Sequence, residues 1–95
     1  MRISDSERQF FKNYWNTNFP GSAVYLFGSR ADDSQKGGDI DLLVLNKDYI
    51  SLREKLSFLN RCLRELEEQR IDLVTYTFEE NPPFKRIALE NAVKL

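Results

Sequence analysis

Residues 24–45 read VYLFGSRADDSQKGGDIDLLVL, and this stretch decides the fold. Residues 23–27 form a short run of β-branched, aromatic and other apolar residues between glycine-containing turns, which predicts a buried strand. Residues 39–45 begin with alternating polar and apolar side chains and end continuously apolar, as a strand does on entering a core. The polar segment 30–38 ends in a glycine pair and predicts a surface connection, with room for one helical turn at its start.

Two amphipathic helices are expected around these strands. Ser4 and Glu7 have the spacing of a capping box, and aromatic residues then recur at helical intervals until Asn18. Residues 48–70 repeat leucine at steps of three and four among charged residues, which is typical of a long amphipathic helix. We expect these leucines to pack in the core, with partner binding or self-association into an oligomer as the alternative. They are Leu52, Leu56, Leu59, Leu63 and Leu66.

The rest of the chain completes a layered fold. Residues 71–77 predict a third strand, and residues 84–93, which follow a proline pair, predict a short helix. The helix between the second and third strands is long enough for a crossover connection. We therefore expect an α/β (α+β) fold with a small mixed β-sheet and helices mainly on one face, in a single domain spanning residues 1–95.

The composition excludes several classes of function. An apolar fraction of 41% and an aromatic fraction of 13% predict a folded globular protein. Fourteen basic and fifteen acidic residues give a net charge of -1, so no global field favours polymeric nucleic acid or an anionic membrane. The sequence has no histidine, which excludes Ser-His-Asp and Cys-His nucleophiles and the usual zinc sites. It shows no signal peptide or membrane span, so a cytoplasmic location is expected.

Some conspicuous residues are expected to have ordinary structural roles. Cys62, the single cysteine, falls on the apolar side of the long helix and predicts a small buried thiol. The aromatic residues of the first helix are assigned to the core rather than to a base-stacking platform. Lys85 and Arg86 are interpreted as solvated charges rather than as nucleotide contacts.

Three aspartates carry the first chemical signal. Asp39 and Asp41 stand two positions apart on the predicted second strand, so their carboxylates project from one face while Ile40 points into the core. Asp72 is an acid in a third strand otherwise suited to burial, and it joins the pair if the two strands are neighbours. Mg²⁺ prefers such oxygen ligands, and two-metal phosphoryl-transfer sites hold ions about 3.5 to 4 Å apart. An Asp-x-Asp pair alone is also compatible with solvated acids at a strand end.

The second signal is Gly28-Ser29-Arg30, directly after the first strand. Glycine lets backbone amides approach an anion, serine offers a hydroxyl, and arginine can form a charge-assisted bond to a phosphate oxygen. A helical turn opening at Ser29 would add its free amide groups and its dipole. The alternative is a tight strand-end turn with a surface arginine.

The combination is more specific than its parts: Gly28-Ser29, nine intervening residues, Asp39-x-Asp41, and Asp72 at the start of a later strand. Here the sequence resembles the nucleotidyltransferase superfamily of DNA polymerase beta type and, by size, the minimal nucleotidyltransferases that accompany HEPN proteins in prokaryotes. The resemblance runs from about residue 24 to 76, with a less specific similarity in the closing segment FKRIALENAVKL. Two features differ: many members have a glycine shortly after the arginine, and their spacer before the first aspartate is often one residue longer.

The resemblance implies a metal-dependent transfer of a nucleoside monophosphate, AMP from ATP, to an acceptor hydroxyl. It implies that Gly28 and Ser29 hold the triphosphate with help from Arg30. It further implies that Asp39 and Asp41 ligate two Mg²⁺ ions, and that Asp72 ligates the catalytic ion and helps to deprotonate the acceptor. No nucleophilic side chain is then required, which suits a chain without histidine.

The implied acceptor is a tyrosine on a partner HEPN toxin, which the modification would silence, so that the protein acts as an antitoxin. Two alternatives remain. One is a non-catalytic antitoxin that keeps the nucleotidyltransferase fold and neutralises its partner by binding. The other is transfer to a small molecule, as in antibiotic-modifying relatives, for which the chain has no obvious acceptor domain.

Overall fold

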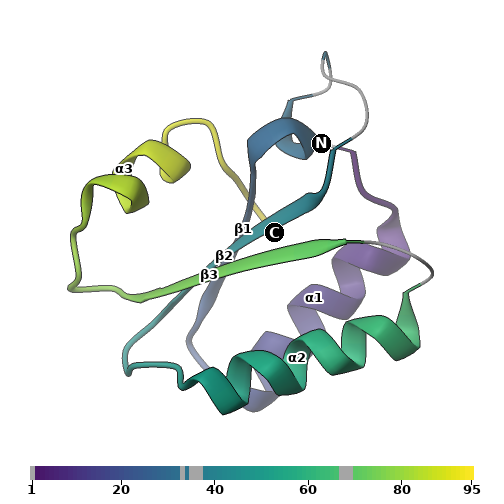
Figure 1. Ribbon diagram of the computed structural model, residues 1–95, viewed down its shortest axis with the longest axis horizontal. Coiled ribbons are helices and arrows are strands. Elements are labelled where there is room, and N and C mark those ends of the chain that lie inside the picture. The colour runs from purple at the N-terminus through teal and green to yellow at the C-terminus, as the bar shows by residue number, and fades with distance from the viewer. Residues whose placement is uncertain (1, 33, 35–37, 67–69) are drawn as a thin grey trace.

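The computed structural model describes residues 2–32, 34, 38–66 and 70–95 (Figure 1). Its elements in chain order are α1 (Asp5–Asn18), β1 (Ala23–Phe27), the 3₁₀ helix η1 (Gly28–Ala31), β2 (Ile40–Asn46), α2 (Leu52–Glu65), β3 (Ile71–Thr77), α3 (Pro83–Leu89) and β4 (Val93–Lys94). The strands form one sheet in the order β3-β2-β1-β4. β1 is antiparallel to both β2 and β4, whereas β2 and β3 are parallel, so the sheet is mixed.

The helices cover the two faces of this sheet unequally. The longer helices α1 and α2 pack together on one face, and the short α3 lies on the other (Figure 1). Because side chains alternate along a strand, Leu42 and Val44 join the core under α1 and α2, while Leu43 and Leu45 join the smaller core under α3. The expected fold, a small mixed sheet with helices mainly on one face, is confirmed.

The N-terminal helix begins where the sequence predicts. The Ser4 hydroxyl accepts a hydrogen bond from the Glu7 amide at 3.1 Å, and the Glu7 carboxylate accepts one from the Ser4 amide at 2.8 Å. This capping box satisfies two of the amide groups that a helix start leaves without partners. Phe11 and Trp15 are fully buried against Phe58 of α2, which confirms that the aromatic residues of this helix belong to the core.

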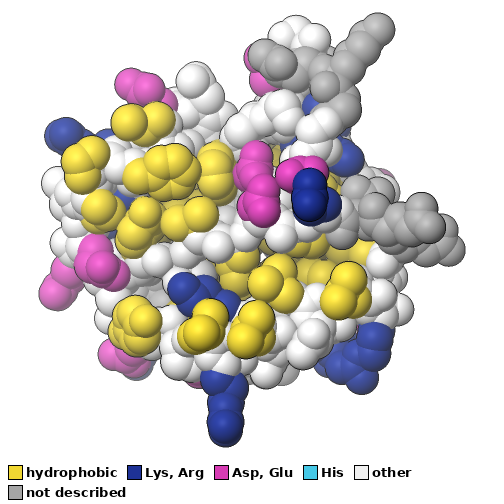
Figure 2. Space-filling view, in the orientation of Figure 1, with side chains coloured by type: hydrophobic (Ala, Val, Ile, Leu, Met, Phe, Trp, Pro, Cys, Tyr) yellow, Lys and Arg dark blue, Asp and Glu magenta, His cyan; other side chains and the backbone are white. Residues whose placement is uncertain are grey.

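Three of the five leucines that the sequence predicts to be in the core are exposed instead. Leu52, Leu56 and Leu63 are 65%, 49% and 76% exposed, whereas Phe58 and Cys62 face the sheet and are buried. The exposed leucines and the buried pair Phe58 and Cys62 are both spaced at helical intervals, so the pattern alone does not tell which face is buried. The Phe58 ring, larger than a leucine side chain, fills the space between α2 and the sheet. Leu59 and Leu66 lie at the border, partly buried against the core. Figure 2 shows the resulting row of hydrophobic side chains along the outside of α2.

The prediction of a closing helix over 84–93 is wrong beyond Leu89. The chain turns after α3, and Val93–Lys94 forms the edge strand β4 beside β1. The Leu95 amide extends this pairing by donating to the Val24 carbonyl at 2.9 Å. Without β4, the outer edge of β1 would present backbone N–H and C=O groups without hydrogen-bond partners, and β4 supplies those partners.

Lys85 is also placed differently from the prediction. It is only 8% exposed, and its ammonium group donates hydrogen bonds to the carbonyls of Thr77, Phe78 and Glu80 at 3.3, 2.9 and 2.6 Å. It therefore ties the start of α3 to the end of β3 instead of lying in solvent.

Cys62 is buried as expected, and burial raises the pKa of its thiol to about 12. Within the described ranges, the helices are too short or too polar to cross a membrane.

Candidate functional site

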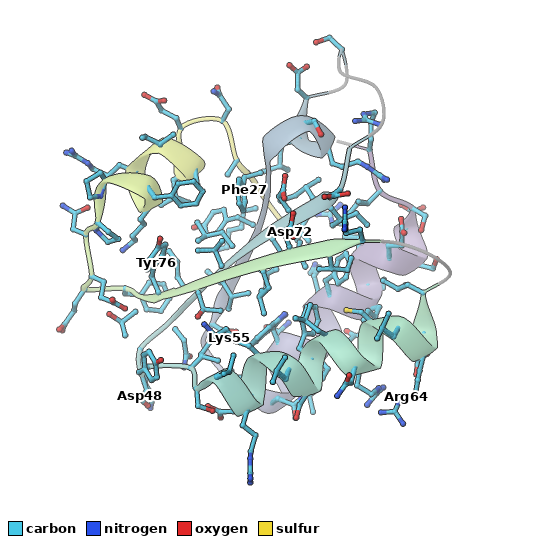
Figure 3. All side chains as sticks on the ribbon, viewed as in Figure 1. Phe27, Asp48, Lys55, Arg64, Asp72 and Tyr76 are labelled. Atoms are coloured by element: carbon cyan, nitrogen blue, oxygen red, sulfur yellow. The ribbon has the colours of Figure 1, made fainter. Side chains whose placement is uncertain are left out.

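Asp41 and Asp72 are brought together by the register of the two parallel strands. Asp41 on β2 is paired directly with Asp72 on β3, and Phe27 of β1 is the partner of Asp41 on its other side. All three residues point to the face that carries α3, while Ile40 is fully buried on the opposite face. Figure 3 shows Asp72 on the outermost of these strands, and its side chain is exposed.

The carboxylates repel one another. The pKa of Asp41 is raised to about 6, first by burial, then by the charge of Asp72 and a side-chain hydrogen bond with it, and finally by the charge of Asp39. A cluster of acids without a compensating cation has this signature. Carboxylate oxygens are also the ligands that Mg²⁺ prefers, so the donor set fits the predicted metal.

Asp39 lies two residues before Asp41, just ahead of β2, and is partly buried. Asp39 raises the pKa of Asp41 through its charge alone, whereas Asp72 raises it through both its charge and side-chain hydrogen bonding. In the described part of the chain, no three acidic or thiol side chains are gathered tightly enough to enclose a metal ion. The structure thus pairs Asp41 with Asp72 and leaves Asp39 at the margin of the pair.

The turn after β1 lies against this acidic pair. Gly28 has φ +71°, a conformation that favours glycine, and a Cβ atom added to it would overlap the carboxylate of Asp41. The residue begins η1, which includes Ser29 and Arg30. Glycine is required here twice, because of its backbone conformation and because of the close approach to Asp41. The candidate phosphate-binding turn therefore lies in direct contact with one of the candidate metal ligands, Asp41.

Arg30 has structural partners. Its Nε donates to the Gly38 carbonyl at 3.2 Å, and its Nη1 donates to the Arg2 carbonyl at 2.9 Å. Arg2 in turn donates from its amide to the Arg30 carbonyl and from its guanidinium to the Ser29 carbonyl. The sequence pattern gave no signal for Arg2, because its partners lie 27 and 28 residues away. The phosphate contact of Arg30 remains a prediction.

A pocket of about 730 Å³ opens between η1 and α3. Its walls include Phe27, Gly28 and Ser29 on one side and Phe84, Ile87 and Asn91 on the other. Phe27 and Phe84 meet edge to face, with ring centroids 5.9 Å apart and an interplanar angle of 79°. Sequence reasoning missed this pocket because the α3 residues have no recognisable motif, and α3 lies across the sheet from the two longer helices.

Both a protein-family model and solved structures are similar to this chain. The model of the nucleotidyltransferase domain family matches residues 8–95. A chain in a mutant crystal structure of the toxin-antitoxin pair MntA-HpeT is 21% identical, with a TM-score of 0.73 over 99% of this chain and 72% of that one. A second mutant of the same pair gives 20% identity and a TM-score of 0.70, over 93% and 70%. No curated protein matches the sequence.

These likenesses support the fold and the family. The two solved structures share the fold with this protein at low sequence identity. The family match is broader evidence, because it covers α1 in large part and every later element, including η1, the acidic pair and α3. The chain belongs to the nucleotidyltransferase domain family.

Proposed function

We propose that this protein transfers AMP from ATP to a hydroxyl group of a partner protein in a metal-dependent reaction, and that it acts as the antitoxin of a cytoplasmic toxin-antitoxin pair. The observation that carries the proposal is the pairing of Asp41 with Asp72 directly beside the Gly28-Ser29 turn. Paired acids next to an exposed glycine turn suit a ligand with phosphates and divalent cations.

Asp39, Asp41 and Asp72 would hold two Mg²⁺ ions, with the carboxylate of Asp39 turning toward the pair. Bound there, the ions would polarise the α-phosphate and neutralise the charge that develops as pyrophosphate leaves. Cation binding would also relieve the repulsion that raises the pKa of Asp41.

The protein's own groups account for positioning and proton transfer. The backbone amides of the Gly28-Ser29 turn and the Ser29 hydroxyl would donate to the triphosphate. Asp72, exposed on the outermost strand, would accept the proton of the incoming hydroxyl. The acceptor oxygen forms a bond to the α-phosphorus, the bond between the α-phosphorus and the bridging oxygen breaks, and pyrophosphate departs.

The acceptor is a tyrosine of a HEPN toxin in this proposal. The two similar structures are of a toxin-antitoxin pair, and the second mutant replaces two aspartates, two positions apart, by glutamate. The position of Asp72 suits an acceptor on a separate molecule, because β3 is an edge strand of the described sheet and pairs with β2 on one side only.

The first test is thermal unfolding with Mg²⁺ and ATP, because a ligand that binds the native state raises the midpoint. The intact protein should show a nucleotide-dependent rise that the Asp41→Asn/Asp72→Asn variant lacks. Asp48→Asn is the matched control, since Asp48 is an exposed acid beyond the other end of β2. No rise at saturating ligand would refute the site.

Exposed leucines on α2 favour a second candidate, a non-catalytic antitoxin. They lie on the face opposite the acidic pair and offer an apolar binding surface that needs no nucleotide. A purified HEPN toxin should be inactivated only when this protein, Mg²⁺ and ATP are all present, with label from the ATP α-phosphate appearing on the toxin. Inactivation without nucleotide would select the binding-only function.

A further inference from the structure

The pocket between η1 and α3 is continuous with the turn assigned to the triphosphate. Gly28 and Ser29 line the pocket, and Gly28 also lies against the Asp41 carboxylate. A ligand whose phosphates occupy the turn would therefore have its remaining part within reach of the pocket. At about 730 Å³, the space lies in the range of small-molecule and cofactor sites.

The walls have the chemistry of a nucleobase site. Phe84 and Ile87, on neighbouring turns of α3, are 45% and 64% exposed although both are large apolar side chains. The edge-to-face contact with Phe27 supports the Phe84 ring from one side. Figure 2 shows the hydrophobic group over α3 immediately beside acidic side chains. Aromatic rings at the edge of a phosphate site are suited to stacking on a base.

Asn91, in the turn that follows α3, is the polar residue that this side of the chain contributes to the pocket, and Ser29 and Asp32 are the polar residues on the η1 side. The side-chain amide of Asn91 presents a donor and an acceptor together. Adenine presents the complementary pair, an N6 amino donor beside the N7 acceptor, and asparagine recognises that edge with two hydrogen bonds. A guanine has acceptors at both corresponding positions, so it satisfies only half of the amide.

We propose that this pocket binds the nucleobase of the substrate, with Phe84 stacking on the base and Asn91 selecting adenine. The inference rests on the proposed nucleotidyltransferase function and adds a specificity element to it. Ile87 contributes apolar contact, and the position of α3 sets the width of the pocket. The segment after β3 is then the part of the chain that determines which nucleoside triphosphate is used.

The test compares the binding of Mg²⁺-ATP with that of Mg²⁺-tripolyphosphate, which has the phosphates but no nucleoside. Calorimetry should show the intact protein binding ATP at least about tenfold more tightly, since stacking of one base contributes at this order. Phe84→Ala should remove most of this difference and leave tripolyphosphate binding unchanged. Phe78→Ala is the matched control, because Phe78 is also 45% exposed but does not line the pocket.

Asn91 is tested through base selection. The intact protein should prefer ATP to GTP, and Asn91→Ala should reduce that preference several-fold, whereas Asn60→Ala, at an exposed site on α2, should not. Unchanged unfolding midpoints without ligand establish that each variant is folded.

The outcomes separate the two proposals. Equal affinity for ATP and tripolyphosphate, or ATP affinity unaffected by Phe84→Ala, overturns the nucleobase pocket while the proposed function stands. Loss of transfer to the acceptor in Phe84→Ala with normal ATP affinity would assign the pocket to the acceptor instead, which also overturns the inference. Binding of neither ligand by the intact protein refutes the proposed function and this inference together.

Discussion

Asp41 and Asp72 stand in direct register on the parallel strands β2 and β3, and after burial the charge of Asp72 and side-chain hydrogen bonding with it raise the pKa of Asp41. Two carboxyl groups can share a hydrogen bond only when one of them carries a proton. Their proximity is therefore unfavourable at neutral pH unless a cation is bound, and the fold maintains it because the strands on which they stand are fixed by core residues. The repulsion between the two carboxylates lowers the free energy of unfolding, and it leaves a concentrated negative charge on the surface of the sheet.

Replacing one acid should therefore stabilise the metal-free protein. Asp41→Asn removes a charge that burial and Asp72 both disfavour, so we expect a higher unfolding midpoint in chelator at neutral pH. The same variant should lose the stabilisation by Mg²⁺ that the intact protein shows. Asp48→Asn should alter neither property; a lower midpoint for Asp41→Asn would contradict the repulsion.

The pH dependence has a definite sign. The pKa of Asp41 is raised from 3.8 to about 6 in the folded state, so the folded protein binds a proton that the unfolded chain releases. The contribution of this group to stability is fully present below about pH 4 and is lost as the pH rises through about 6. Denaturant unfolding in chelator should show this loss in the intact protein and not in Asp41→Asn. Parallel profiles for the two proteins would refute it.

Two glycines allow backbone strain to be separated from contact with the acidic pair. Gly28 and Gly21 both have positive φ, at +71° and +87°, but a Cβ atom at Gly21 meets nothing within 4 Å. Gly21→Ala should cost about 1 to 2 kcal/mol from the left-handed conformation alone. Gly28→Ala should cost more and should also abolish ATP binding, because its methyl group displaces Asp41. Equal losses in chemical denaturation would show that the contact is not tight.

Two large apolar side chains of α2, Phe58 and Leu63, should contribute very differently to stability, because one is buried and the other is exposed. Phe58→Ala should destabilise the protein by about 3 to 5 kcal/mol, because the ring is fully buried between α1 and the sheet. Leu63→Ala should change the free energy of unfolding by less than about 0.5 kcal/mol, since its side chain is 76% exposed. A large loss for Leu63→Ala in urea unfolding would mean that another molecule covers this face.

Cys62 should report on opening of the core. Its thiol is buried and its pKa is about 12, so at about pH 8 almost none of it is the reactive thiolate. Alkylation by iodoacetamide should be very slow in buffer and fast in denaturant, with mass spectrometry as the readout. Rapid labelling in buffer would show that α2 separates readily from the sheet.

The sequence predicted the parts of this fold that depend on local pattern. The strands 23–27 and 71–77 and the capping box of Ser4 and Glu7 are short-range signals, and the structure confirms them. The meeting of Asp41 with Asp72 could also be anticipated, because a crossover helix makes the two strands parallel neighbours. The roles assigned to these aspartates remain predictions.

The errors came from contacts that a local pattern does not encode. The leucine repeat showed that α2 has an apolar face, yet Phe58 and Cys62 determine the rotation of the helix against the sheet. β4 forms because Val93 pairs with Leu26, far away in sequence. Lys85 is held by backbone carbonyls, which have no side-chain signature in a sequence.

The hydrogen bond from Arg30 to the Gly38 carbonyl sets the distance between the turn after β1 and the start of β2. It joins the two ends of the polar segment, and Gly38 packs so closely on the Ser29 hydroxyl that a Cβ atom would overlap it. These two contacts hold the residues just before β2, the strand that carries Asp41, against the turn after β1. A substitution that weakens either contact should therefore change the spacing between the Gly28-Ser29 turn and the acidic pair, even though it is made outside both.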